Sequence, residues 1–388
     1  MPRRGFAPTV QAIPGAVYSP FAQRLPRSGI PPVPLHVGDT WLPACVGARM
    51  QDLTAEDHPD LHRYAPTAGV PALLDALVEK LRVRNGIACE RDEVLVGAGA
   101  TGVLANAVGA IAAPGEEVLI LAPFWPLIRG IVQAFRATPV EVPFFDRVHS
   151  ADDAVAAVGE RITQRSVALY VSTPSNPTGR ILPRPWLEAL AELAAAHDLW
   201  LIADEVYEDY VYEGEHFSVA TAAPDRTLSV FSFSKAYGMA GHRVGYLAGP
   251  ASLVHEAHKV GTHTAYHAPV AGQLVGLSAL AVGADWIAKA RASYREVGFE
   301  SAATLGLAPP QGSTFHFIDV AERLDERGMH GFLEDCFEDG VLVAPGASSG
   351  SDYQSWIRLC YTAAPPDDVR VATRRLARRI GAGLPNDR

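Results

Sequence analysis

The sequence WLIADEVY at residues 200–207 passes from a short apolar run directly into acidic and aromatic side chains. Residues 227–235, TLSVFSFSK, repeat this arrangement and end on a lysine. Apolar runs of this length are typical of buried strands in a sheet that is covered on both faces. Polar side chains just beyond such strands lie where open α/β sheets place their ligand sites. The two stretches therefore predict an α/β sheet with a functional site at one edge.

Five further runs have the length and composition of strands, and helical segments fit between several of them. Strands are expected at residues 93–96, 117–121, 139–142, 167–171, 200–203, 227–231 and 245–248. The clearest helices are expected at residues 71–81, 101–112, 126–135 and 185–197. This alternation predicts a mostly parallel seven-stranded sheet flanked by helices. The strand at 245–248 follows without an intervening helix, so it could run antiparallel.

The chain is organised differently beyond residue 270. A long alanine-rich helical region extends to about residue 305, and strands at 315–320, 341–343 and 356–361 precede a helix at 366–380. This pattern predicts a smaller α+β domain. The first 45 residues are rich in proline and predict an extended arm that the small domain recruits. The expected domains are residues 1–45 (arm and part of the small domain), 46–285 (large) and 286–388 (small).

Composition narrows the class of protein. Of the 388 residues, 48% are hydrophobic and 20% charged, which is a globular profile. The net charge of −10 comes without a basic stripe, so we expect no nucleic-acid partner. No apolar run reaches the length of a membrane span and no signal peptide is indicated, so we expect no membrane association and a cytoplasmic location. The four cysteines form no C-x-x-C pair, which predicts neither disulfides nor a metal site.

Two more polar clusters follow predicted strands. Residues 97–102, GAGATG, lie before a helix, where backbone N–H groups suit a phosphate, although a tight turn explains the same glycines. Residues 175–179, SNPTG, have the composition of an ordinary turn. Alternatively, they direct the Asn176 amide toward the strand ends. Each cluster alone is weak support for a function.

The two opening stretches also have ordinary explanations. Asp204 could cap a helix, and Lys235 could simply reach solvent. A carboxylate at the end of a buried strand is costly, however, unless it meets a cation or donors. Arg243 and two serines near Lys235 create the cationic, partly desolvated setting that keeps a lysine amine nucleophilic. The joint occurrence of all four clusters on one α/β chain predicts a functional site.

Over nearly its whole length, the sequence resembles the fold-type I, class I/II aminotransferases that depend on pyridoxal phosphate (PLP). The matching pieces are Tyr64–Pro66 with Gly69, Gly99–Gly102, Pro123–Trp125, Ser175–Gly179, Asp204–Tyr207, Ser232–Lys235 with Arg243, and Trp356–Leu359. The resemblance implies an aspartate aminotransferase-like fold with PLP as the cofactor. It also implies an amino acid and a 2-oxo acid as the substrates.

The resemblance implies three catalytic residues. Lys235 would bind PLP as a Schiff base and move the proton between substrate and cofactor. Asp204 would pair with the protonated pyridine nitrogen and so keep the ring an electron sink. Tyr207, together with Asn176, would hydrogen-bond the phenolate oxygen of the cofactor.

Further residues are implied for binding. Trp125 would stack on the cofactor ring. The residues implied around the cofactor phosphate are Ala100, Thr101, Gly102, Ser232, Ser234 and Arg243. Tyr64 would reach the phosphate of the neighbouring subunit, which implies a homodimer with active sites at its interface. Arg358 would hold the substrate α-carboxylate, helped by Asn176 and the backbone of Gly38.

Three departures from the family pattern bear on the substrate. Residues 38–41 are GDTW where many relatives carry Gly-Glu-Pro, and residues 345–350 lack the usual Phe-Gly after Pro-Gly. The segment 261–267, which in relatives contributes across the dimer, has no arginine. The missing arginine argues against aspartate or glutamate as the preferred donor, and the change at 345–350 removes an aromatic wall of the pocket. The amino donor and acceptor stay open.

Two other functions are compatible with PLP binding. A PLP-dependent lyase or cyclising enzyme would use the same scaffold, because the first carbanion is shared and the later steps depend on the pocket. A non-catalytic PLP-binding module would be expected to carry a helix-turn-helix or basic region, which the sequence lacks, and it would not need Lys235, Asp204, Tyr207 and Arg358 together. Transamination is therefore the predicted reaction.

Overall fold

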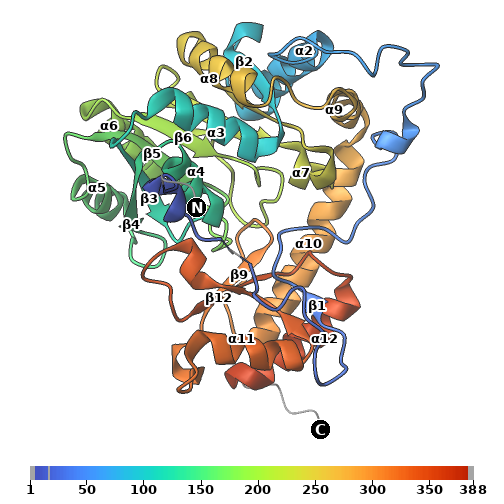
Figure 1. The fold of residues 1–388 in the computed structure, drawn as a ribbon, viewed down its shortest axis with the longest axis vertical. Helices are drawn as coiled ribbons and strands as arrows, with labels where there is room; N and C mark the ends of the chain where they lie inside the picture. The colour runs from blue at the N-terminus through green and yellow to red at the C-terminus, as the bar shows by residue number, and fades with distance from the viewer. Residues whose placement is uncertain (1–4, 16–17, 383–388) are drawn as a thin grey trace.

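A seven-stranded sheet forms the centre of the computed structural model, which describes residues 5–15 and 18–382 (Figure 1). The strand order is β2-β8-β7-β6-β5-β3-β4. The strands are β2 (Val94–Gly97), β3 (Glu117–Ala122), β4 (Thr138–Pro143), β5 (Ser166–Ser172), β6 (Trp200–Asp204), β7 (Thr227–Ser232) and β8 (Gly245–Ala248). β8 runs antiparallel to β2 and β7, and the other neighbours pair in parallel. The predicted mostly parallel seven-stranded sheet is confirmed, and β8, whose direction the sequence left open, is its antiparallel strand.

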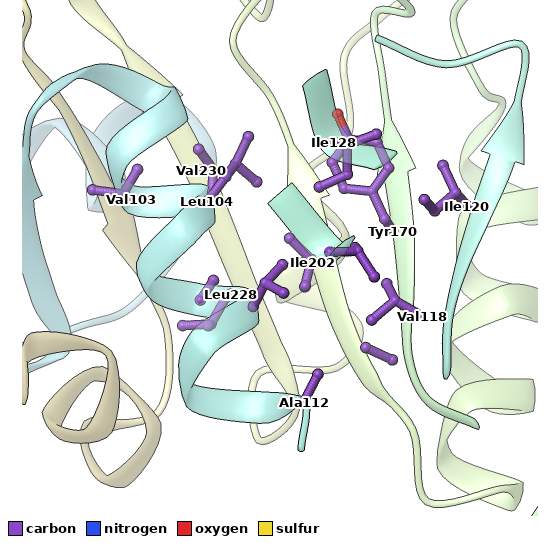
Figure 2. Close-up of a cluster of buried hydrophobic side chains, with 14 of the residues drawn as sticks. Val103, Leu104, Ala112, Val118, Ile120, Ile128, Tyr170, Ile202, Leu228 and Val230 are labelled. Atoms are coloured by element: carbon purple, nitrogen blue, oxygen red, sulfur yellow. The ribbon is translucent and has the colours of Figure 1, made fainter. Parts of the chain in front are cut away.

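Helices cover both faces of this sheet. One face packs on α3 (Gly99–Ile111), α4 (Pro126–Ala134) and α8 (Ala251–Thr264), and the other on α5 (Ala151–Gly159) and α6 (Arg184–Ala196). Along β5, Ala168 and Tyr170 join the first core while Leu169 and Val171 join the second. This alternation follows from the two-residue period of a strand. Figure 2 shows the first core, in which side chains of α3 meet those of the sheet.

Proline fixes several helix starts. α2 (Pro71–Lys80), α4 and α12 (Pro366–Ile380) each have a proline in the first turn, where the missing N–H would have had no partner within the helix. α12 ends at Gly381 in the left-handed conformation that glycine adopts without strain. The sequence therefore marks these boundaries closely.

A second group of elements lies below the large sheet in Figure 1. The antiparallel sheet β11-β12-β9 is built from β9 (Phe315–Asp319), β11 (Ala344–Pro345) and β12 (Trp356–Cys360). β1 (Val33–Pro34) pairs in parallel with β10 (Val341–Leu342), so the N-terminal segment reaches these C-terminal elements. The helices here are α10 (Ala284–Leu305), α11 (Gly328–Glu338) and α12.

The helical region after residue 270 differs from the prediction. It consists of two helices, α9 (Val270–Val282) and α10, which meet at an angle of 82° at Gly283.

In the described part of the chain, no single helix is long and apolar enough to cross a membrane. Only the bent pair α9 and α10, taken together, passes that test of length and composition. The sequence pattern does not define the short helices α1 (Pro8–Gln11) and α7 (Phe233–Ala236), nor α5, α8 and α11. The domain boundaries stay predictions.

His316 on β9 is a buried imidazole between β9 and α10. Its Nε2 lies 2.7 Å from the hydroxyl of Ser301, and its ring centroid lies 4.8 Å from that of Tyr361. Burial lowers the pKa of His316 from 6.5 to about 4. The folded protein therefore holds this ring neutral at pH values where the unfolded chain would protonate it.

We expect His316 to make the folded state less stable in acid. Because the pKa is depressed in the folded state, its contribution is fully present above pH 6.5 and is lost as the pH falls toward 4. The full loss is on the order of 3 kcal/mol. The melting temperature of His316→Gln should therefore fall less than that of wild type between about pH 7.5 and about pH 5. An exposed control, His255→Gln on α8, should behave as wild type, and equal pH slopes for all three proteins would contradict the prediction.

Candidate active site

A cavity of about 310 Å³ lies at the carboxyl ends of the central strands. The residues predicted for the site that line it are Gly38, Ala100, Thr101, Trp125, Asn176, Asp204, Tyr207, Ser232, Ser234, Lys235, Arg243 and Arg358. They come from segments spread over most of the chain. Parallel pairing explains part of this convergence, because Asp204 is in register with Ser172 on β5 and with Val230 on β7.

Lys235 is the lysine of this cavity. The chain has four lysines, Lys80, Lys235, Lys259 and Lys289, and only Lys235 lines the cavity. It lies on the short helix α7, and its Nζ donates a hydrogen bond to the carbonyl of Gly38. The Tyr210 hydroxyl donates to the Lys235 carbonyl at 2.8 Å, which fixes the backbone of α7. Burial lowers the pKa of Lys235, so a larger fraction of the amine is neutral and nucleophilic near neutral pH.

Asp204 ends β6 and is buried. Its Oδ2 accepts a hydrogen bond of 2.5 Å from the Tyr170 hydroxyl, and its Oδ1 lies 3.3 Å from the backbone N–H of Val206. Burial raises the pKa of Asp204 to about 6, and the hydrogen bond from Tyr170 opposes that rise. A carboxylate in this environment gains free energy from any cation that enters the cavity beside it.

The acidic residues that follow Asp204 have cationic partners. Glu208 pairs with Lys80, and Asp209 pairs with Arg84. Within residues 5–15 and 18–382, no ion pair joins Asp204 to a basic side chain. Of the acidic residues at the end of β6, Asp204 is therefore the one left for a ligand.

The partner of Glu205 is a histidine, His216. Its Oε2 lies 2.7 Å from Nε2 of His216 and also accepts a hydrogen bond from Ser218. Burial lowers the pKa of His216, but the hydrogen bond and charge of Glu205 outweigh burial and raise it overall. The raised pKa favours the charged imidazole beside the Glu205 carboxylate.

An anion-binding corner forms at the start of α3. Gly99 has a φ of +74°, and a Cβ at this position would lie 2.3 Å from Nη2 of Arg243. The guanidinium thus rests directly on the glycine, beside the free backbone N–H groups of a helix N-terminus. The hydroxyls of Thr101, Ser232 and Ser234 line the same cavity. This is the donor set that a phosphate requires.

Arg358 forms a second anion-binding group on β12. It is buried, and its Nη1 and Nη2 donate to Oδ1 of Asn176 and to the carbonyl of His36, each at 3.1 Å. Its guanidinium also lies 4.7 Å from the ring centroid of Phe315. The buried Nε has no hydrogen-bond partner in the described chain. A buried cation with an unused donor fits a carboxylate ligand.

Two predicted residues lie elsewhere. Gly102, predicted to bind the cofactor, is the fourth residue of α3 and does not line the cavity. A Cβ at this position would lie 3.3 Å from that of Ala98. Tyr64 is 83% exposed and packs edge-on against Tyr266 outside the cavity. A tyrosine so exposed does not act on the site of its own chain.

The cavity also has lining residues that sequence reasoning missed. They are mainly apolar: Tyr18, Val37, Leu104, Leu127, Val206, Ala240 and Phe315. Leu104 was visible only as part of the apolar stripe of a helix. Tyr18 and Val37 lie in the proline-rich segment that has no periodicity, and Phe315 appeared as one residue of a predicted strand. No local pattern distinguishes these residues from the core.

The arrangement brings four chemical groups into one cavity. A lysine amine, a buried carboxylate without a cation and two separate anion-binding groups surround a partly apolar space. Such a set can hold a flat, phosphorylated, positively charged ring and a second ligand with a carboxylate. An arrangement of this kind supports covalent catalysis by the amine.

Comparisons with known proteins agree with this chemistry. The sequence model of the family described as aminotransferase class I and II matches residues 33–376. An aspartate/prephenate aminotransferase of Thermus thermophilus is 35% identical over 329 residues, which cover 82% of this chain and 83% of that protein. An arginine–pyruvate transaminase of Pseudomonas aeruginosa is 34% identical over 325 residues, or 81% of each protein. A solved structure of a single mutant of T. thermophilus aspartate aminotransferase has a TM-score of 0.87 at 32% identity, covering 97% of this chain and 100% of its own.

These matches confirm the resemblance, the fold type, the reaction class and the cofactor inferred from the sequence. The family match spans most of the chain and includes every predicted residue that lines the cavity. The chain belongs to the aminotransferase class I and II family and is a PLP-dependent aminotransferase.

Proposed function

We propose that this aminotransferase carries its cofactor on Lys235 and acts as a homodimer on an α-amino acid and a 2-oxo acid. The observation that carries the assignment is the convergence of Lys235, Asp204 and Arg358 on one cavity. Each of these charged groups is unusual in a protein interior. The lysine suits attachment of the cofactor, the aspartate suits its ring nitrogen, and the arginine suits the α-carboxylate of a substrate.

The residues present fit PLP. The guanidinium of Arg243, resting on Gly99 where any side chain would displace it, offers a cradle for the phosphate. The buried carboxylate of Asp204 lacks a cation and suits the pyridine nitrogen. The indole of Trp125, at the start of α4, offers a flat surface for the ring. When bound, PLP supplies an electron-withdrawing ring that stabilises negative charge at the substrate α-carbon.

Lys235 would perform the proton transfers. Its Nζ would hold the cofactor, and once free it would take the α-proton of the amino acid and give it back on the cofactor side. A base that serves in both directions needs an accessible neutral form, which burial favours by lowering the pKa of Lys235. Tyr207 and Asn176 would orient the phenolate side of the ring, since both lie at the cavity.

Arg358 would bind the α-carboxylate of both substrates. Asn176 and the His36 carbonyl already hold two of its nitrogens, so the guanidinium is fixed before a substrate arrives. The free Nε then adds a donor to the incoming carboxylate. A fixed donor gives up less entropy on binding than a mobile one.

Tyr64 supports the homodimer. Because its side chain is exposed and does not line the cavity of its own chain, we expect it to complete the phosphate site of a partner subunit. The exposed Val46 and Val282 would be covered in the same assembly. The active site would then be complete only in the dimer. We place this enzyme in the cytoplasm, without a nucleic-acid or membrane partner.

Lys235→Ala should abolish transamination, because no other lysine lines the cavity. Wild type should show a yellow absorbance band that borohydride bleaches, and mass spectrometry should find the reduced cofactor on the Lys235 peptide. Lys259→Ala, an exposed lysine on α8, is the matched control and should behave as wild type. Full activity in Lys235→Ala, or a label on Lys80, would contradict the assignment. Release of ammonia and pyruvate without transfer of the amine would instead indicate a lyase.

Arg358→Lys should weaken the binding of both substrates while leaving the cofactor in place. Lysine lacks the planar fork of arginine, so kcat/KM should fall on the order of a hundred-fold for amino acid and 2-oxo acid alike. The absorbance of the bound cofactor should be unchanged. The control is Arg129→Lys, whose guanidinium pairs with Glu141 outside the cavity. An unchanged KM in Arg358→Lys would show that the carboxylate binds elsewhere.

Hybrid dimers would test the position of Tyr64. Lys235→Ala and Tyr64→Phe are each expected to impair every site of their own homodimers. In a hybrid of the two, one site contains an intact Lys235 and the unaltered Tyr64 of the other subunit. Mixing the variants under conditions of subunit exchange should therefore restore activity toward half of the wild-type value per hybrid dimer. No gain on mixing would place Tyr64 outside the partner's site.

A further inference from the structure

Tyr170 is a tyrosine inside the first core of the large sheet. It lies on β5 between α4 and the neighbouring strands, and its side chain is fully buried (Figure 2). Apolar residues supply most of this core, and Tyr170 and Tyr353 are the buried tyrosines within it. A buried hydroxyl requires a partner. The partner of the Tyr170 hydroxyl is Oδ2 of Asp204, at 2.5 Å.

This hydrogen bond is the shortest contact of the Asp204 carboxylate. A distance of 2.5 Å is typical of a hydroxyl that donates to an ionised oxygen. The backbone N–H of Val206 approaches the other oxygen only to 3.3 Å. One carboxylate oxygen is therefore held firmly, while the second has spare capacity for another donor.

The surroundings of Asp204 make this donor important. Glu205 is the adjacent carboxylate and disfavours ionisation of Asp204, although His216 and Ser218 hold Glu205 itself. Tyr207 and Lys235 line the same cavity. Before a ligand enters, the Tyr170 hydroxyl is thus the principal group in the described chain that favours the ionised form of Asp204 against burial.

We propose that Tyr170 is a positioning residue for the reaction: its hydroxyl keeps the Asp204 carboxylate charged and turned toward the ring nitrogen of the cofactor. The proposal rests on the function proposed above. Tyr170 does not line the cavity, so it would act only through Asp204. The rigid position of the ring within the core would fix the direction of the carboxylate.

The test compares Tyr170→Phe with wild type. Phenylalanine keeps the ring in the core and removes only the donor, so kcat/KM should fall on the order of ten- to a hundred-fold. The acid limb of its pH profile should move to higher pH, because Asp204 loses a group that favours its charge. The pH midpoint of the cofactor absorbance should also rise, since a less positive ring makes the Lys235 nitrogen easier to protonate. The dissociation constant of PLP, measured by titrating the apoenzyme, should increase.

Tyr353→Phe is the matched control. The buried hydroxyl of Tyr353 donates to Oδ1 of Asp146 at 2.6 Å, which is the same chemistry outside the cavity. This variant loses a comparable hydrogen bond, so it should reproduce any general effect on stability. It should leave the absorbance midpoint and the pH profile of wild type unchanged.

A double-mutant cycle separates positioning from a structural role. If Tyr170 acts through Asp204, Tyr170→Phe should cause no further shift of the absorbance midpoint in an Asp204→Ala background. Should Tyr170→Phe fail to fold, a ring-fluorinated tyrosine at position 170 keeps the shape and strengthens the donor, and it should move the midpoint to lower pH.

Three results would overturn the proposal: a wild-type midpoint in Tyr170→Phe, an equal shift in Tyr353→Phe, or a shift that persists without Asp204. If wild type transaminates and one of these is found, only the role of Tyr170 fails. If wild type does not transaminate, the proposed function fails first.

Discussion

The rest of the site depends on a carboxylate that is buried without a counter-ion. Asp204 ends a central strand. Burial disfavours its charged form and raises the pKa of Asp204 to about 6. The neighbouring acidic residues have partners: Glu208 has Lys80 and Asp209 has Arg84. The fold thus neutralises the acidic turn after β6 and leaves one negative charge at the cavity. A positively charged cofactor ring is the natural complement of that charge.

The cavity is assembled from both groups of elements. The large sheet contributes Asp204 and, through α7, Lys235, while Arg358 comes from the antiparallel sheet β11-β12-β9. The N-terminal segment adds Gly38, whose carbonyl accepts a hydrogen bond from Lys235. The groups proposed to hold the cofactor and the arginine proposed to hold the substrate therefore lie on separate sheets. Binding of a substrate between them would couple their positions.

Much of this could be predicted from the sequence. The strands can be predicted because each apolar run ends in polar residues. The missing helix before β8 makes an antiparallel direction possible for that strand, and the structure shows it. The helices α5, α8 and α11 were harder to define, and the kink at Gly283 was not foreseen. Such features depend on contacts between distant segments. Among the residues that line the cavity, those with reactive or charged side chains could be predicted from the sequence, whereas apolar ones such as Phe315 could not.

The sequence alone determined the family, the cofactor and the residues with reactive groups, because the local motifs around Lys235 and Asp204 specify both the strand ends and the side chains placed there. Only the tertiary structure decided which residues support them. Tyr170 appears in the sequence as one more residue of a buried strand, and nothing local reveals its hydroxyl as the donor to Asp204. That contact arises from the pairing of β5 with β6, and pairing across a sheet is a property of the folded chain.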